Sequence, residues 1–192
     1  MNAIFSAFAP SAATQIRMDH AHVLTTAHHY AGDLPPSAKR ALFNAIAIAL
    51  EIHAQLEEEL FYPAVAIVEP GKVGNNVPEH DAMRELIATL RGMSASHPDY
   101  DGTFHTLMRT VMRHVADEET LLLPEAERSL GRELDRIGAE MAMRRMQLVT
   151  ARGGEIAAAT LYLLPSSLLL GGAGAMLAGM HAVRYAMRRF GA

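Results

Sequence analysis

The chain has 192 residues and a formal net charge of −4 at pH 7, and half of its residues are hydrophobic. This apolar content is sufficient for a sizeable core, and the acidic balance does not favour a nucleic-acid-binding surface. The absence of cysteine excludes disulfides, Cys-ligated zinc sites, iron–sulfur clusters and thiol catalysis. Ten histidines and twelve methionines are high counts for this length.

Apolar residues recur at spacings of three and four over the first part of the chain, which predicts helices rather than strands. A first helix is expected over 11–31, because Gly32 and a pair of prolines follow it. A long second helix is expected over 37–68. Pro63 should kink this helix or loosen its last turns.

A loop rich in Gly, Asn and Pro is predicted over 69–78. Two more helices are expected after it, over 78–92 and 103–129. Four helices with short connections predict an all-α, up-down-up-down four-helix bundle. A fifth helix, over 131–151, is amphipathic and carries its apolar residues on one face.

The distribution of charge divides the chain near Gly153. No charged residue occurs from Ile156 to Met180, whereas the rest of the chain is rich in charge. Three units are therefore predicted: a four-helix bundle over 1–130, an amphipathic connecting helix over 131–154 and a hydrophobic C-terminal helix over 155–192.

Two stretches share the pattern H-x-x-x-E-E-x-L-x-x-P. HAQLEEELFYP begins at His53 and HVADEETLLLP begins at His114. Each is preceded, 33 or 34 residues earlier, by another histidine, His20 or His80. This internal repeat predicts that the bundle consists of two similar helical hairpins.

A histidine and a glutamate four residues apart project from the same face of a helix. Leu60 lies on the stripe of His53, and Val111 and Leu121 lie on the stripe of His114, so these faces should point into the core. Burying an ionised carboxylate without a partner is costly, and a mixture of imidazoles and carboxylates with open positions indicates non-haem iron. The predicted ligands of two metal ions, with both glutamates bridging, are His20, His53, Glu57, His80, His114 and Glu118.

The alternative to a metal centre is a buried polar network or a pH-sensitive cluster of histidines. The second copy of the pattern and the core-facing register favour the metal centre. Three further acids, Glu58, Glu59 and Glu119, are interpreted as solvated or as lying behind the ligands. The remaining histidines are interpreted as surface or secondary residues: His22, His28, His29, His97, His105 and His181.

In order and spacing, the six predicted ligands form an H-HxxxE-H-HxxxE pattern that resembles the hemerythrin-like, HHE cation-binding family. The LFYP and LLLP tails and the EHD around His80 strengthen the resemblance, which covers residues 12–130. It implies a four-helix bundle that holds two iron ions with an oxo or hydroxo bridge.

The chain departs from the oxygen-carrying hemerythrins at one position. Those proteins bring a further histidine four residues after the counterpart of His80, and Arg84 stands there instead. One iron would then carry water, or Glu58 or Tyr62 would replace the missing ligand. The departure argues against simple reversible oxygen carriage and leaves room for peroxide or nitric oxide chemistry.

The expected function is binding or sensing of dioxygen or nitric oxide at a non-haem di-iron centre, because neutral imidazoles hold ferrous iron. The alternative is a di-iron enzyme that consumes peroxide, as a catalase does, or nitric oxide. Iron storage is a lesser alternative, since a two-metal site has no cavity to fill. A metal- and gas-binding protein is favoured over an enzyme.

The uncharged segment over 156–180 is long enough to span a bilayer as a helix. The N-terminal residues carry no basic region, so no secretory signal is predicted. The expected location is therefore the cytoplasmic face of a membrane, with this segment as the anchor. The alternative is a soluble cytoplasmic protein in which the segment forms an apolar hairpin that mediates a homodimer.

Overall fold

The computed structural model describes residues 9–69, 71, 73–74 and 76–157. All regular secondary structure in this part of the chain is helical, which confirms the predicted all-α fold. No helix formed by these residues combines the length and the apolar character that crossing a membrane requires. Nearly all of the hydrophobic segment over 156–180 lies outside the described residues, so its role as an anchor or a dimer contact stays a prediction.

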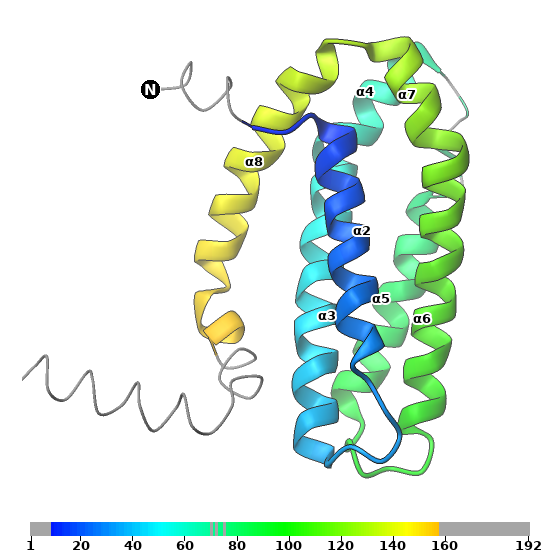
Figure 1. Ribbon diagram of the computed structural model, residues 1–192, viewed down its shortest axis with the longest axis vertical. Coiled ribbons are helices and arrows are strands. Elements are labelled where there is room, and N and C mark those ends of the chain that lie inside the picture. Colours follow the sequence, from blue (N-terminus) through cyan, green and yellow to red (C-terminus); the bar gives the residue numbers. More distant parts are fainter. Residues whose placement is uncertain (1–8, 70, 72, 75, 158–192) are drawn as a thin grey trace, which may run out of the picture.

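Four antiparallel rods form the bundle (Figure 1), and a further helix lies beside them. The second and fourth rods each consist of an α-helix, a π-helical turn and a short α-helix. The elements are α2 (Ala12–His28), α3 (Pro36–Leu56), η1 (Glu57–Phe61), α4 (Tyr62–Val68), α5 (Asn76–Gly92), α6 (Tyr100–Asp117), η2 (Glu118–Leu122), α7 (Leu123–Leu130) and α8 (Glu133–Ala151).

Local signals account for several helix ends. The Ser11 side chain caps α2 by accepting a hydrogen bond from the backbone N–H of Thr14 at 3.3 Å. At its other end, α2 stops at His28 rather than at the predicted residue 31. The backbone N–H groups of the next two residues bond only three residues back, which tightens and closes the last turn. Gly131, with φ +50°, ends α7.

The two π-helical turns immediately precede the two prolines of the repeat. A proline inside an α-helix clashes with the carbonyl group four residues before it. In η1 the backbone N–H of Tyr62 instead bonds to the carbonyl of Glu57, five residues back, and Pro63 follows as the second residue of α4. The arrangement in η2 is the same, before Pro124. The predicted loosening of the helix near Pro63 therefore takes the form of one wide turn.

These wide turns change which residues face the core. Leu121 is predicted on the inward stripe of His114, but its side chain is 67% exposed, whereas Leu122 is 3% exposed. In the first hairpin Phe61 is fully buried and the predicted Leu60 only half-buried. The prediction for Leu121 is wrong because each π-helical turn inserts one extra residue and rotates the inward stripe by one position.

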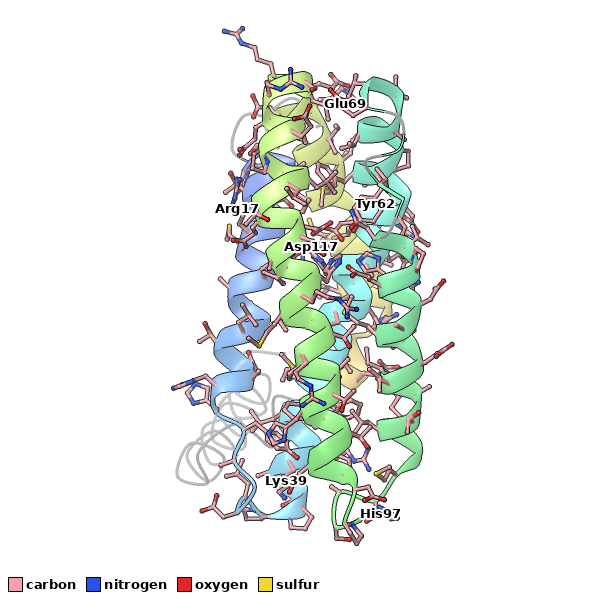
Figure 2. The ribbon with its side chains drawn as sticks, turned by 90° about the vertical axis from the view of Figure 1, so that its right-hand side faces the viewer. Arg17, Lys39, Tyr62, Glu69, His97 and Asp117 are labelled. Atoms are coloured by element: carbon pink, nitrogen blue, oxygen red, sulfur yellow. The ribbon has the colours of Figure 1, made fainter. Side chains whose placement is uncertain are left out.

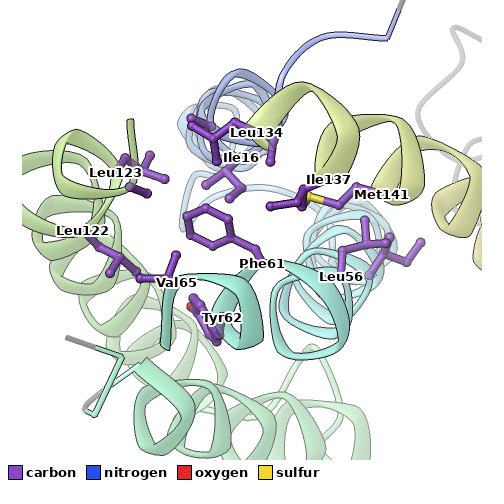
Figure 3. Packing of buried hydrophobic residues seen from close by; sticks show 14 of the residues in the cluster. Ile16, Leu56, Phe61, Tyr62, Val65, Leu122, Leu123, Leu134, Ile137 and Met141 are labelled. Carbon is purple, nitrogen blue, oxygen red and sulfur yellow. The ribbon is translucent and has the colours of Figure 1, made fainter. Parts of the chain in front are cut away.

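Two apolar clusters fill the bundle, one above and one below a polar layer (Figure 2). Phe61 lies at the middle of the first cluster (Figure 3), and Phe104 belongs to the second. Along α2, Ile16 packs in the first cluster and Val23 in the second, with the buried His20 between them. The polar layer is thus closed by apolar side chains at both ends.

The helix α8 lies on the outer side of α2 and α3 (Figure 1). The Gln15 side chain donates to the carbonyl of Gly138 at 2.6 Å, which joins α2 to α8. The four apolar residues of the predicted amphipathic face are all buried, which confirms that prediction: Leu134, Ile137, Met141 and Leu148.

Replacing Gly138 with alanine is expected to destabilise the protein by about 2 kcal/mol, because overpacking typically costs about 1–3 kcal/mol. A Cβ atom there would lie 2.3 Å from the carbonyl oxygen of Pro10 and 2.8 Å from the backbone nitrogen of Ala12. The gain of roughly 1 kcal/mol in helix propensity does not offset this clash. Urea unfolding measures the effect. Gly92→Ala is the control, since its Cβ meets nothing within 4 Å, and equal effects of the two changes would contradict the prediction.

Candidate metal centre

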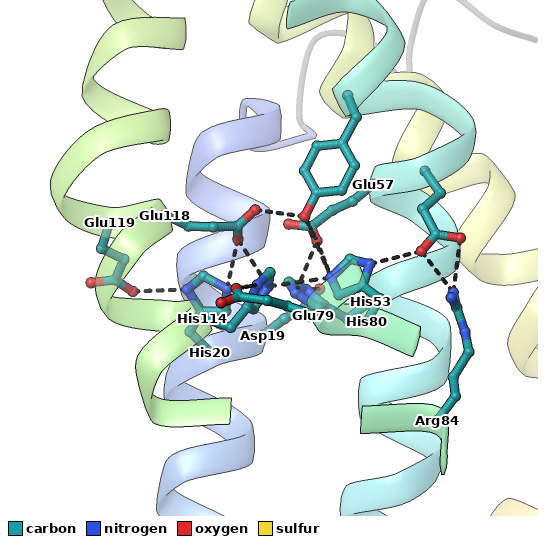
Figure 4. Close-up of polar contacts among 12 residues, drawn as sticks. Asp19, His20, His53, Glu57, Glu79, His80, Arg84, His114, Glu118 and Glu119 are labelled. Carbon is teal, nitrogen blue, oxygen red and sulfur yellow. Dashed lines mark hydrogen bonds and ion pairs between the residues drawn. The ribbon is translucent and has the colours of Figure 1, made fainter. Parts of the chain in front are cut away.

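The structure brings the six predicted ligand side chains together in the middle of the bundle (Figure 4). Each of the four rods contributes one histidine, and the second and fourth rods add one glutamate each at the start of the π-helical turn. All six residues are at most 3% exposed: His20, His53, Glu57, His80, His114 and Glu118.

Each of the two carboxylates lies between two imidazole rings. Glu57 Oε2 is 3.2 Å from His53 Nε2 and 3.3 Å from His80 Nε2. Glu118 Oε2 lies 3.3 and 3.5 Å from the Nε2 atoms of the other two histidines. The geometry therefore repeats the internal symmetry of the sequence.

Every histidine of the cluster has an acidic side chain behind its Nδ1 atom; we call these four residues the outer acids. Within hydrogen-bond distance, as for His20, His80 and His114, such an acid holds the proton on Nδ1, fixes the ring and leaves the Nε2 lone pair facing the centre. The distances from Nδ1 to the nearest carboxylate oxygen are 2.8 Å for His80 and Glu58, 3.0 Å for His20 and Glu119, 3.2 Å for His114 and Glu79, and 3.6 Å for His53 and Asp19.

Two of the outer acids, Asp19 and Glu79, were not singled out from the sequence. Each directly precedes a ligand histidine and lies behind the histidine on the other helix of its own hairpin. Glu58 and Glu119, which directly follow Glu57 and Glu118, contact histidines of the other hairpin. Their common signal in the sequence is an acid next to a predicted ligand in both copies of the repeat.

The contact between His80 and His114 tests whether a cation fits this cluster. Their Nε2 atoms are 3.2 Å apart. Because both rings direct Nδ1 at a carboxylate, both Nε2 atoms carry lone pairs, and two acceptors cannot form a hydrogen bond. A positive ion between the two nitrogens turns this repulsion into attraction.

Other buried polar atoms of the cluster also lack a partner that a cation would supply. A buried polar atom ordinarily has a hydrogen-bond partner. Four buried atoms that face the centre have none among the described residues: His20 Nε2, His53 Nε2, Glu57 Oε1 and Glu118 Oε2. Two overlapping groups each offer four ligand atoms within 4.8 Å of one another, namely His20, His53, His114 and Glu118, and His53, Glu57, His80 and His114. The residues present therefore fit a metal.

The electrostatics of the cluster also favour a cation. Burial raises the pKa of Glu57 well above its usual range, and the charge of the neighbouring Glu118 raises it further. Burial opposes ionisation of Glu118 too, but its contact with His20 and the nearby imidazoles lower its pKa. Burial lowers the pKa of three histidines, which keeps them neutral, the form that binds a metal: His53, His80 and His114.

Tyr62 is a further polar group inside the cluster. Its hydroxyl oxygen lies 2.7 Å from Glu118 Oε1, 2.9 Å from Glu57 Oε2 and 3.4 Å from His80 Nε2, so its single proton can be donated to either carboxylate. Burial and the charges of both carboxylates raise the pKa of Tyr62, so the phenol keeps its proton. Leu123 takes the equivalent place in the second hairpin, which makes the two halves of the cluster chemically different.

Arg84 occupies the position of the missing fifth histidine. Its Nη2 atom donates to both oxygens of Glu58 at 2.8 Å, and Glu58 in turn contacts His80 Nδ1. Glu58 therefore lies on the outer side of His80, away from the other ligand atoms. Glu58 and Tyr62 are the two protein groups considered for the open position. Of these two, Tyr62 is the one whose oxygen lies among the other predicted ligand atoms.

The other histidines lie where they were predicted, as far as the structure describes them. Five of them are exposed, which confirms their interpretation as surface residues: His22, His28, His29, His97 and His105. His181 lies outside the described residues.

Comparison with known proteins agrees with the geometry. A model of the hemerythrin HHE cation binding domain matches residues 11–126. The chain belongs to this family. The fold of this HHE domain is also similar to a crystal structure of an HHE cation binding domain-containing protein from Mycobacterium kansasii, a homolog of Rv2633c. The TM-score is 0.66 and the sequences are 20% identical, with 80% of this chain and 99% of that chain covered.

Two relatives in sequence each match about two thirds of the HHE protein. The uncharacterized protein Rv2633c of Mycobacterium tuberculosis (strain ATCC 25618 / H37Rv) is 27% identical over 133 residues, which cover 67% of this chain and 82% of that protein. A protein of Nostoc sp. (strain PCC 7120) named DNA nickase is 31% identical over 121 residues, which cover 62% of this chain. The match spans only 34% of the Nostoc protein's length.

Proposed function

We propose that this HHE protein is a non-haem di-iron protein that binds or senses dioxygen or nitric oxide. The proposal rests on the Nε2 atoms of His80 and His114, which face each other at 3.2 Å. Two nitrogen lone pairs at this distance repel each other unless a cation or an added proton lies between them. In this proposal the four histidines and two glutamates of the cluster would hold two iron ions. Ferrous iron would supply affinity for a small diatomic gas.

The residues of the chain would supply the surroundings that such a centre requires. The apolar clusters above and below exclude bulk water. The outer acids hold the imidazole rings in the orientation that directs Nε2 inward. Tyr62 holds a proton at its hydroxyl, next to both carboxylates, and is the nearest protic side chain to a ligand that enters the cluster.

The composition of the cluster supports gas binding rather than turnover. Imidazoles outnumber carboxylates in the cluster, and neutral imidazoles suit the lower oxidation state of iron. Arg84 and Glu58, which pair with each other, leave one position of the centre without a histidine. A small ligand would then meet a position that no histidine occupies, next to the Tyr62 hydroxyl.

The test combines metal analysis with optical spectroscopy of the full-length protein. After loading with ferrous iron without air, we expect two irons per chain and a spectrum that changes stoichiometrically when dioxygen or nitric oxide is added. Failure to take up iron would contradict the di-iron centre. In stopped-flow experiments, repeated consumption of peroxide or nitric oxide would contradict a binding role and would identify an enzyme instead.

A further inference from the structure

The last described helix reaches the metal centre through a single arginine. Arg145 of α8 donates to both oxygens of Asp19, from Nη1 to Oδ1 at 2.9 Å and from Nη2 to Oδ2 at 2.6 Å. Asp19 is the outer acid of His53, with Oδ2 at 3.6 Å from Nδ1 (Figure 4). A two-pronged contact of this kind fixes the plane of a carboxylate as well as its place.

This arrangement differs from the other sides of the centre. Glu58 is held by Arg84 on α5, and Glu79 is held by Arg113 on α6, so these outer acids are fixed from within the bundle. Asp19 is fixed from α8 instead, beyond the residues 11–126 that the family model matches. Its distance to the histidine, 3.6 Å, is also the longest of the four and exceeds hydrogen-bond distance, so Asp19 acts on the His53 ring as a nearby negative charge whose place Arg145 fixes.

Open space on both sides of the Arg145–Asp19 pair lets the aspartate move if it is released. A cavity of about 440 Å³ lies between α2 and α8 next to the pair, with Met18 and Met146 in its wall. A second cavity of about 320 Å³ lies on the other side, with Ile52 in its wall. Asp19 is 18% exposed. Without the arginine, its carboxylate can turn away from His53 toward water without displacing packed side chains.

The attachment of α8 can be separated from this contact. Arg144, the neighbour of Arg145, makes an equivalent two-pronged pair with Glu59, at 2.7 and 2.9 Å. Glu59 also accepts a hydrogen bond from Gln55, which is not among the predicted ligands of the centre. Removing either arginine therefore removes one tether of α8, but only Arg145 lies behind an outer acid.

We propose that Arg145 is a positioning residue of the metal centre, which holds Asp19 behind His53 and so slows the release of metal from that side. The inference rests on the proposed di-iron function. Loss of an acid behind a ligand histidine typically lowers metal affinity about 10- to 100-fold. Arg145 contacts Asp19 and not the histidine itself, so we expect a smaller effect: its loss should speed metal release by about 3- to 10-fold.

The experiment measures transfer of ferrous iron from the loaded, full-length protein to a soluble chelator, together with the optical spectrum of the centre. Arg145→Ala should release iron about 3- to 10-fold faster than the wild type and shift the spectrum. Arg144→Ala, the matched control, should change neither. In an Asp19→Asn background, Arg145→Ala should have no further effect, because the residue through which it acts is already altered.

Three results would overturn the inference. Equal rates for Arg145→Ala and Arg144→Ala would show that both arginines merely attach α8. An undiminished effect of Arg145→Ala in the Asp19→Asn background would show that it does not act through the aspartate. Release that is unchanged or slower in Arg145→Ala would also contradict it. These results differ from failure of the di-iron proposal, in which the wild type itself takes up no iron and the inference falls with it.

Discussion

Replacing His53 and His114 together with alanine is expected to remove the bound iron completely, from two ions per chain to none. Both histidines belong to both groups of four side chains that can hold a metal, so each group loses half of its ligands. The remaining imidazoles and carboxylates cannot complete the coordination of either ion. Metal analysis of the purified variant measures the result, and two irons per chain would contradict the ligand assignment.

A matched pair of changes separates loss of ligands from loss of histidines in general. His22→Ala with His105→Ala removes two exposed histidines from helices of the same bundle and should leave the iron content unchanged. His53→Gln with His114→Gln leaves polar side chains of similar size in the core. It should give the same loss of iron in a chain whose helical circular dichroism is retained. Iron retained by this second variant would point to ligands other than the two rings.

Replacing Leu122 with alanine is expected to destabilise the protein by about 3 kcal/mol, within the range of 2–5 kcal/mol for large-to-small changes in a core. Leu122 is 3% exposed and packs in the same cluster as Phe61. The change removes buried methyl groups and leaves a cavity beside the polar layer. Chemical denaturation of the two proteins under identical metal conditions measures the difference.

The neighbouring residue provides the control for this change. Leu121→Ala alters the same kind of side chain one position earlier, but Leu121 is 67% exposed. It should change the free energy of unfolding by no more than about 0.5 kcal/mol. If Leu121→Ala were the more damaging of the two, the helix would continue without the wide turn and the stripe predicted from the sequence would be right after all.

The fold and the cluster were predictable to a large extent because both depend on short-range periodicity. A histidine and a glutamate four residues apart share a helix face in any α-helix, so His53 and Glu57 had to point the same way. Apolar residues on the same stripe, such as Val111 on the stripe of His114, indicated that this face was the inner one. The amphipathic α8 was predictable for the same reason, from apolar residues that recur on one side of a helix.

The wide turns were not predictable at this level, although their cause is local. Pro63 is visible in the sequence, but a proline late in a helix can produce a kink, an end or a wide turn, and each gives a different register beyond it. The choice of a π-helical turn keeps the rod continuous and places Phe61, rather than Leu60, against the first apolar cluster.

The sequence by itself therefore determined the helices, the two-hairpin repeat and the six inward side chains, because each follows from residues within one or two turns of a helix. Tertiary structure alone decided which acid lies behind which histidine, that Arg84 binds Glu58, and that Arg145 reaches Asp19 from a helix 126 residues away. Those pairings depend on how the helices rotate and approach one another. The rotation and approach of the helices are set by the packing of both apolar clusters together and not by any local spacing.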